Sequence, residues 1–160
     1  MATKQATKSK YQTREDDRVF SEAERAAVAA TARERKAASG RSPADERAEG
    51  LQDLKESIAK MPPDDRAMGE RIHEIVSGAV PALVPKTYYG MPAYAREGKD
   101  GKVIAFFKPK SKFKVRYSTL GFQADASLDE GDMWATEFAV IKLTPAVEKK
   151  LADLVKKAAG

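Results

Sequence analysis

The segment Tyr88-Tyr89-Gly90-Met91-Pro92-Ala93-Tyr94 organises this 160-residue chain. Three tyrosines surround a Gly-Met-Pro centre, and tyrosine favours strands whereas Gly and Pro interrupt them. We therefore predict a short strand, a kink and a second strand, lined by large amphipathic rings, and we call residues 88–94 the tyrosine turn. Such a kink either braces a small core or lines a pocket, and the residues alone leave both interpretations open.

Three helix patterns precede the tyrosine turn, and further strand patterns and a final helix pattern follow it. Strand-like segments are predicted at 87–89, 93–96, 103–107, 113–120 and 138–143. Helices are predicted near 21–39, at 43–60, from Asp64 or Asp65 to about 79, and from Thr144-Pro145 onward. The turn signal at 97–101 predicts a hairpin, and strands joined by short turns must be antiparallel. The pattern predicts an α+β fold, a small antiparallel sheet with helices packed on one face.

Caps and apolar spacing define the predicted helices. Ser21 and Glu24 fit a capping box, and the alanine-rich helix that follows buries little area, so we expect it to dock loosely or to project. Gly50 is expected to weaken the second helix by about 1 kcal/mol relative to alanine. Asp64 or Asp65 is expected to cap the third. The buried faces are predicted to hold Leu51, Leu54, Ile58 and Met61; Met68, Ile72, Ile75, Val76 and Ala79; and Val147, Leu151, Leu154, Val155 and Ala158.

The net charge of +5 is unevenly distributed. Residues 1–44 hold ten Lys/Arg and six Asp/Glu and so carry +4 of it. We interpret 1–44 as a basic, partly disordered N-terminal extension with a disordered tail at 1–17, and 45–160 as the folded domain. The extension is either a solubilising tail or an arm that contacts nucleic acid through residues 1–41.

The composition limits the classes of protein that this chain can represent. The absence of cysteine excludes disulfides, thiol nucleophiles and thiolate metal sites. No apolar run approaches the ~18 residues of a membrane helix, and the N-terminus lacks the apolar stretch of a secretory signal, so we expect a cytoplasmic protein with no membrane partner. No nucleophile-elbow, Walker or Rossmann spacing occurs, so nothing in the sequence supports an enzyme.

Aromatic and basic residues suggest a ligand site beside the tyrosine turn. Lysine or arginine occupies every second position from Lys108 to Arg116, which would place these cations on one face of a continuous strand, although Pro109 argues against such a strand. Aromatic rings could stack on a ligand while a cation pairs with its anionic group. The candidate ligand-binding residues are Tyr88, Tyr89, Met91, Tyr94, Lys112, Arg116 and Trp134. The alternative is that the rings form core and the lysines protect an edge strand.

Carboxylates between the last two predicted strands suggest a metal site. Asp129, Glu130, Asp132 and Glu137 are candidate ligands for a hard cation such as iron. Their spacing does not match a calcium loop, and a solvated acidic turn is the alternative. His73, the single histidine, is expected to have a structural or surface role, since one histidine without cysteine builds no histidine-rich metal site.

Residues 51–158 resemble the YdhG-like family of small bacterial domains of unknown function. The resemblance is carried by Arg71-Ile72-His73-Glu74-Ile75, the tyrosine turn, Gly101-Lys102-Val103-Ile104-Ala105-Phe106-Phe107, and the closing helix at 143–157. It implies an α+β domain with helices against an antiparallel sheet. Some members are described as frataxin-like iron chaperones, which implies weak binding of iron by carboxylates and docking to a partner.

Three functional hypotheses follow. The first is a non-enzymatic binding domain for a small molecule or a protein segment beside the tyrosine turn. The second is an iron chaperone that uses the carboxylates at 129–137. The third is an accessory nucleic-acid-binding protein that acts through residues 1–41. The oligomeric state is left open.

Overall fold

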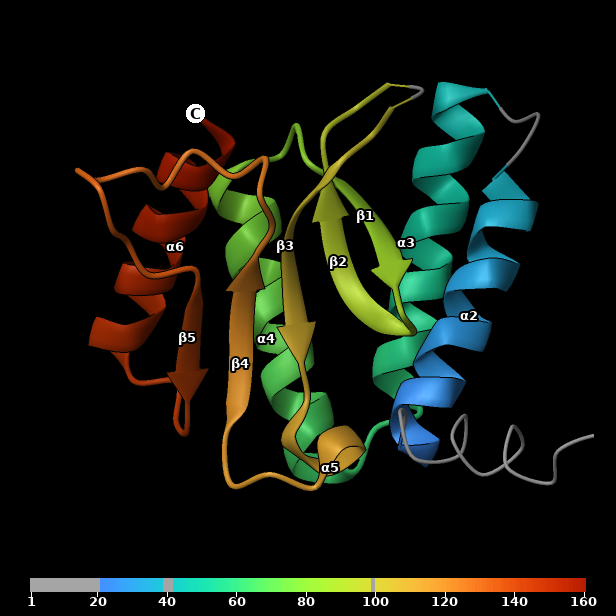
Figure 1. Cartoon of the computed structure of the whole chain (residues 1–160), viewed down its shortest axis with the longest axis horizontal. Coiled ribbons are helices and arrows are strands. Elements are labelled where there is room, and N and C mark those ends of the chain that lie inside the picture. The colour runs from blue at the N-terminus through green and yellow to red at the C-terminus, as the bar shows by residue number, and fades with distance from the viewer. Residues whose placement is uncertain (1–20, 39–41, 99) are drawn as a thin grey trace, which may run out of the picture.

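The computed structural model describes residues 21–38, 42–98 and 100–160 (Figure 1). The helices of this part are α2 (Glu22–Ala38), α3 (Pro43–Ala59), α4 (Pro63–Ala79), α5 (Lys110–Phe113) and α6 (Pro145–Ala159). The strands are β1 (Val84–Tyr88), β2 (Met91–Ala95), β3 (Val103–Lys108), β4 (Ser118–Phe122) and β5 (Glu137–Val140). The tail expected at 1–17 lies outside the described residues. Within them, no helix combines the length and the apolar character needed to cross a membrane.

The five strands form one antiparallel sheet in the order of the sequence, β1-β2-β3-β4-β5. Together with the helices, this confirms the predicted α+β class. The tyrosine turn is the tight hairpin between β1 and β2, because Tyr88 pairs with Met91 and leaves a loop of two residues. Tyr89 (φ 50°) and Gly90 (φ 75°) both have positive φ, as a type I′ turn requires. The hairpin predicted around 97–101 joins the antiparallel neighbours β2 and β3.

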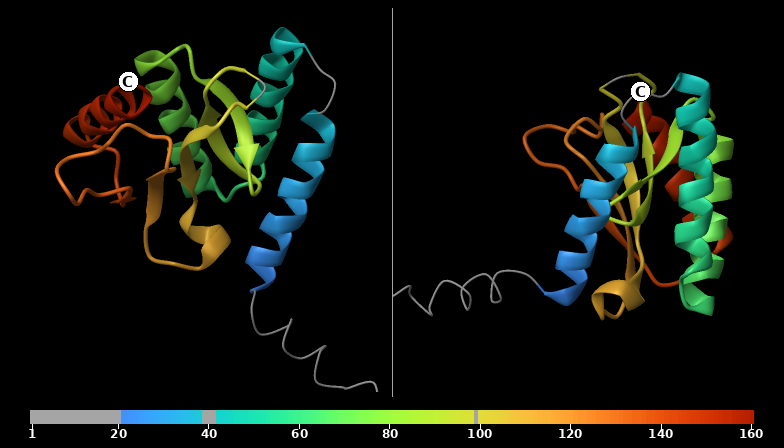
Figure 2. Two further views of the ribbon diagram at one scale, coloured as in Figure 1. Left: turned by 45° about the horizontal axis from the view of Figure 1, so that its top comes forward. Right: turned by 90° about the vertical axis from the view of Figure 1, so that its right-hand side faces the viewer.

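Helices cover the two faces of the sheet unequally. In the right-hand view of Figure 2, α3, α4 and α6 lie on one side of the sheet and α2 lies on the other, beside β1. The main core lies between the sheet and the three helices, as predicted. Its fully buried side chains include Tyr94 and Phe107 from the strands, Leu54 from α3, Ile72 from α4 and Val155 from α6. The alanine-rich helix α2 therefore docks on the sheet, with Ala27 and Thr31 buried.

Polar caps begin three of these helices. The capping box is confirmed, since Ser21 Oγ accepts from the Glu24 N–H at 3.2 Å and the Glu24 carboxylate accepts from the Ser21 N–H at 3.0 Å. Ser42 caps α3, and Thr144 caps α6 by accepting from the Val147 N–H at 3.3 Å. These bonds satisfy backbone donors that a helix leaves unpaired at its first turn.

The third helix begins differently from the prediction. Pro62 is the N-cap of α4 and makes no side-chain cap, and Asp65 is instead buried inside the protein with only 1% of its surface exposed. The expected capping role of Asp64 or Asp65 is therefore wrong. The physical reason is tertiary: the Asp65 carboxylate accepts from the backbone of α5, which is far away in the sequence.

The predicted strand at 113–120 is also wrong in its first half. Residues 110–113 form the single helical turn α5, Lys114 is left-handed (φ 53°), and strand β4 begins only at Ser118. Pro109, at the start of α5, interrupts the alternating lysines as its sequence position indicates. These cations consequently do not share one strand face.

Gly50 is a packing requirement rather than a weak point of α3. It is buried, and a Cβ placed on it would lie 2.1 Å from the carbonyl oxygen of Pro85 in β1. The helix can approach the strand this closely only because residue 50 has no side chain. Leu51, next to it, is only half-buried, whereas Leu54 and Ile58 are buried as predicted.

Candidate functional site

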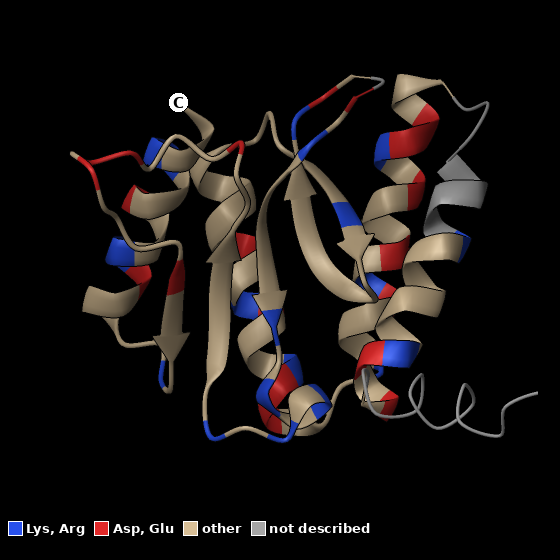
Figure 3. Cartoon of the chain, in the orientation of Figure 1, with Lys and Arg blue, Asp and Glu red and all other residues tan. Residues whose placement is uncertain are grey.

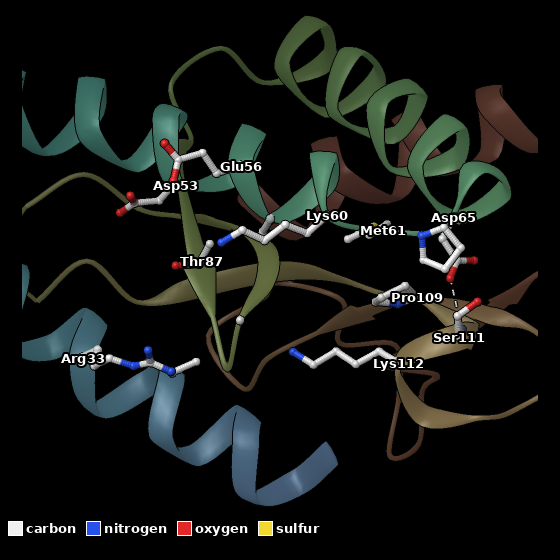
Figure 4. Close-up of a pocket in the computed structure, with 14 residues that line it drawn as sticks. Arg33, Asp53, Glu56, Lys60, Met61, Asp65, Thr87, Pro109, Ser111 and Lys112 are labelled. Carbon is white, nitrogen blue, oxygen red and sulfur yellow. Dashed lines mark hydrogen bonds between the residues drawn. The ribbon is translucent and has the colours of Figure 1, made fainter. Parts of the chain in front are cut away.

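A cavity of about 650 Å³ lies beside the tyrosine turn. Its walls come from α2, α3, the turn itself and α5, which are distant in the sequence (Figure 4). Charged side chains that line it include Arg33, Asp53, Glu56, Lys60, Asp65 and Lys112. Apolar lining is contributed by Ala30, Met61, Pro62 and Pro109. The cavity thus combines an apolar surface with charges of both signs, as small-molecule sites often do.

Gly90 brings α5 and α2 close to the hairpin. A Cβ on Gly90 would lie 2.8 Å from Lys112 Nζ and 3.5 Å from the Cβ of Ala30. The glycine therefore meets two needs, the positive φ of the turn and the space for the ammonium group. Lys112 Nζ donates to the carbonyl of Tyr89 at 2.7 Å, so the hairpin holds this ammonium at the edge of the cavity.

Buried Asp65 anchors the α5 wall. Its Oδ2 accepts from the Ser111 N–H at 3.1 Å, while the Lys110 N–H donates to Ser118 Oγ at 3.0 Å. These bonds pair two of the N–H groups at the start of α5, one with α4 and one with β4. These bonds fix the position of α5, a short helix without buried residues, and thereby also the position of Lys112.

The charges around this cavity belong to separate elements. Figure 3 shows charged residues along α3 and around α5 and the start of α4, whereas β2 and β4 contain none. Arg33 comes from α2, Lys60 from the C-cap of α3 and Lys112 from α5. Three cationic side chains from three elements thus line one hollow.

The structure brings together part of the candidate set named from the sequence. Met91 belongs to a second apolar cluster with Phe106, and Tyr88 and Tyr89 pack against it. The Tyr88 ring lies 4.4 Å from that of Tyr89 in an edge-to-face contact and 5.8 Å from that of Phe106, measured between centroids. Lys112 joins this group through the Tyr89 carbonyl.

Tyr94 lies on the opposite face of the sheet. It is 1% exposed, its ring stacks on His73 at 5.9 Å, and its hydroxyl lies 3.2 Å from His73 Nδ1. Burial raises the pKa of Tyr94 far above its ordinary value. Burial, and secondly the Lys55 cation, lower the pKa of His73. Tyr94 is therefore a core residue in contact with the half-buried His73, and neither lines the cavity.

Arg116 and Trp134 are also apart from the turn. The Arg116 guanidinium lies 5.1 Å above the ring of Tyr117, at a different cavity of about 410 Å³ that Lys110 and Ser118 also line. Trp134, 39% exposed, lies in the connection between β4 and β5. The seven candidate residues therefore do not form a single site.

The acidic candidates Asp129, Glu130, Asp132 and Glu137 are all exposed. Within residues 21–38, 42–98 and 100–160, no three His, Cys, Asp or Glu side chains gather closely enough to hold a metal ion. Glu130 instead lies 3.8 Å from the ammonium of Lys157. Among the described residues, therefore, the acidic candidates do not gather into a ligand set for iron, and the nucleic-acid hypothesis concerns residues that lie mostly outside the described part.

Most of the charged side chains that line the cavity are not predicted from the sequence. Asp53, Glu56 and Lys60 follow one another at spacings of three and four residues, which places Asp53, Glu56 and the C-cap Lys60 on one face of α3. That spacing was the available signal for α3. Arg33 and Asp65 gave no comparable signal, because only the tertiary fold brings them to the cavity.

Taken together, fold and site define an α+β domain with a charged cavity at the end of its first hairpin. No protein-family model, curated protein or solved structure matched this chain. The resemblance to the YdhG-like family therefore rests on the residues quoted above.

Proposed function

We propose that this chain is a non-enzymatic binding domain whose site is the cavity beside the tyrosine turn, and that its ligand is a small molecule with an anionic group. The observation that carries the proposal is the convergence of Arg33, Lys60 and Lys112, from three elements, on one cavity of about 650 Å³. That volume lies within the range of about 300–1,000 Å³ that is usual for small-molecule sites.

Preorganisation supports this proposal. Lys112 Nζ is tied to the Tyr89 carbonyl, and α5 is tied to the core through Asp65 and Ser118. An ammonium group already held in position loses little freedom when a ligand arrives. Arg33 adds a planar fork that suits the two oxygens of a carboxylate.

The Ser57 hydroxyl in the lining favours binding over catalysis. Ser57 Oγ donates to the carbonyl of Leu54 at 2.7 Å, a local bond to its own helix rather than a bond to a general base. This contact describes a structural role for the Ser57 hydroxyl.

The proposal is tested by titrating the full chain with sodium 4-methylpentanoate and following ¹H–¹⁵N chemical shifts. We expect saturable shifts at Gly90 and Lys112, weakened about tenfold or more by Arg33→Gln. The matched control is Arg25→Gln, which removes the same charge from an exposed position of α2 outside the cavity lining. Absence of saturable shifts at the cavity, or equal weakening by the control, would overturn the proposal.

A further inference from the structure

The two edges of the sheet differ in how they are protected. Strand β1 contains Pro85 and Lys86, and α2 lies beside it. Strand β5, at the other edge, contains neither lysine nor proline, and it pairs with β4 in an unbroken register. Its one charged residue is Glu137, at its first position. Proteins commonly use lysine, proline, bulges or a covering element to stop an edge strand from pairing with another chain, so β5 is the less protected edge.

The backbone of β5 presents unpaired groups at this edge. The Phe122 N–H donates to the Thr136 carbonyl at 2.8 Å, directly before β5 begins. Antiparallel pairing then alternates, so every second residue of β5 turns its backbone groups toward β4 and the others turn theirs away. The outward groups belong to Glu137, Ala139 and Ile141, which are all exposed. Within the described part of the chain, no further strand lies beyond them.

Exposed apolar side chains lie before and after this strand. Met133 and Trp134 precede β5 and are 88% and 39% exposed, and Ile141 follows it and is 71% exposed. Of the five large apolar side chains that are exposed among the described residues, these three adjoin one strand. A gathering of exposed apolar groups is typical of a surface that another molecule covers.

The segment that enters β5 is acidic. It carries the four exposed carboxylates that the sequence suggested as metal ligands, and Lys157 lies 3.8 Å from one of them, Glu130. Figure 3 shows red along this connection and at the start of β5, and blue directly after the strand.

The segment that leaves β5 is basic. Three cationic side chains line a cavity of about 410 Å³ there, namely Lys110, Arg116 and Lys142. Two carboxylates of the same cavity are engaged within the protein, Asp65 by the backbone of α5 and Glu148 by Arg71 at 2.7 Å. The third, Asp64, is exposed and does not balance the three cations. The two ends of β5 therefore carry opposite charges.

We infer that β5 is a self-association edge, on which a second copy of this chain adds its own β5 in the antiparallel orientation. A two-fold axis at Ala139 sets Ala139 opposite Ala139 of the second copy and Glu137 opposite Ile141. The outward N–H and C=O groups of these residues then pair, and the two sheets become continuous. This interface lies at the opposite edge of the sheet from the tyrosine turn, so it goes beyond the proposed function.

Charge selects both the partner and the orientation. The two-fold axis brings the acidic entry of each strand beside the basic exit of the other, whereas a parallel pairing would bring like charges together. One strand thus carries both halves of a complementary surface, which is what a second copy of the same chain requires.

Side chains of the other face also match in this register. Phe138 is half-buried against the main core and Val140 is buried. The two-fold axis places Phe138 of each copy opposite Val140 of the other. Aromatic and β-branched residues that lie opposite one another stabilise a sheet, so the main cores of the two copies would meet through these pairs.

Sedimentation velocity of the full chain over a range of concentrations is the first test. We expect a reversible equilibrium between monomer and dimer that weakens as salt is added, because salt screens the charged ends. Ala139→Pro should weaken the association about tenfold or more, since the N–H that it removes faces the second copy and not β4. Urea unfolding checks that this variant keeps its fold.

Reversed charges test the orientation. Glu137→Lys and Lys142→Glu should each weaken the dimer severalfold, whereas the double variant should recover the association, because its reversed ends again meet opposite charges. Glu70→Lys makes the same reversal at an exposed position of α4 and is the control, so it should leave the association unchanged.

A single cysteine reports the register, because the chain has none of its own. Opposite residues of a hydrogen-bonded antiparallel pair have Cα atoms about 5.5 Å apart, and a disulfide spans about 4.4–6.8 Å between Cα atoms. Ala139→Cys should therefore form a disulfide-linked dimer under mild oxidation. Ala146→Cys, at an exposed position of α6, is the control and should stay mainly monomeric.

Each outcome decides for or against this edge. A chain that stays monomeric at about 1 mM would overturn the inference, even if the edge captured a different protein. A dimer that neither Ala139→Pro nor the charge reversals weaken would place the contact on another surface. If Ala139→Pro loses its fold, the charge reversals and the Ala139→Cys crosslink decide, and equal crosslinking by Ala146→Cys would count against β5.

Discussion

Replacing Gly50 by alanine tests the packing of α3 on β1 directly. Glycine within a helix normally costs about 1 kcal/mol relative to alanine, so Gly50→Ala would stabilise an isolated helix. In this fold the new methyl group would lie 2.1 Å from the Pro85 carbonyl oxygen and 3.2 Å from its carbonyl carbon. Both are backbone atoms of a paired strand, so a simple change of rotamer cannot relieve the collision.

The size of the effect follows from two opposing contributions. Forcing an extra methyl group into a well-packed site costs about 1–3 kcal/mol. Subtracting a helix-propensity gain of about 1 kcal/mol leaves a net loss of up to about 2 kcal/mol in the free energy of unfolding. Gly78, near the end of α4, is the matched control, because no other described part of the chain comes within 4 Å of a Cβ there. Gly78→Ala should gain up to about 1 kcal/mol.

Urea unfolding followed by far-ultraviolet circular dichroism measures both variants on one scale. The difference between them, about 1–3 kcal/mol, isolates the collision, since the change in helix propensity is common to both. A Gly50→Ala variant stabilised to the same extent as Gly78→Ala would show that α3 does not approach β1 as closely as described, and the reasoning would be refuted.

Three other contacts give measurable expectations. Asp65→Ala should lower the free energy of unfolding by about 1–3 kcal/mol by leaving the Ser111 N–H without its acceptor, whereas Asp65→Asn, which keeps an oxygen, should cost less in the same urea assay. Burial lowers the pKa of His73 in the folded protein below its ordinary 6.5, so the contribution of His73 to the free energy of unfolding should be fully present above about pH 6.5 and should be lost as the pH falls through the pKa of the folded state. NMR can titrate this single imidazole, and a pKa at or above 6.5 would contradict the prediction. Thr144→Ala should cost about 1 kcal/mol through the lost cap of α6, seen as a lower melting temperature, while Thr144→Ser should retain most of it.

Local sequence signals predicted much of the fold because their physics is local. The kink predicted in the tyrosine turn follows from the positive φ that Gly90 accepts, and the capping box at Ser21 and the helix start at Thr144-Pro145 depend only on neighbouring residues. The hairpin between β2 and β3 likewise follows from its own turn residues.

Errors arose where a distant partner determines the role of a residue. Asp65 has the residue type and the position of a helix cap, but its carboxylate accepts a hydrogen bond from the N–H of Ser111, 46 positions later. In the sequence Gly50 only weakens its helix, and the need for glycine becomes visible only when Pro85 of β1 packs against it.

The candidate site also combines residues that are close in the sequence with residues that only the tertiary fold brings together. Tyr88, Tyr89, Met91 and Lys112 gather at the hairpin, since three of them are local to it. Tyr94 was assigned to the same group, yet the pairing of β2 with β1 and β3 turns it toward α4, where it meets His73. Arg33 reaches the cavity only through the docking of α2 beside β1.

The sequential order of the strands also bears on how quickly this chain acquires its structure. Each strand pairs with the next one along the chain, so every ladder closes a short loop, the longest being the connection between β4 and β5. Folding rates rise as the average sequence separation of native contacts falls, because less chain entropy is lost before each contact forms. The sheet can therefore assemble one hairpin at a time, and the tight loop at Tyr89 and Gly90 is suited to form among the first.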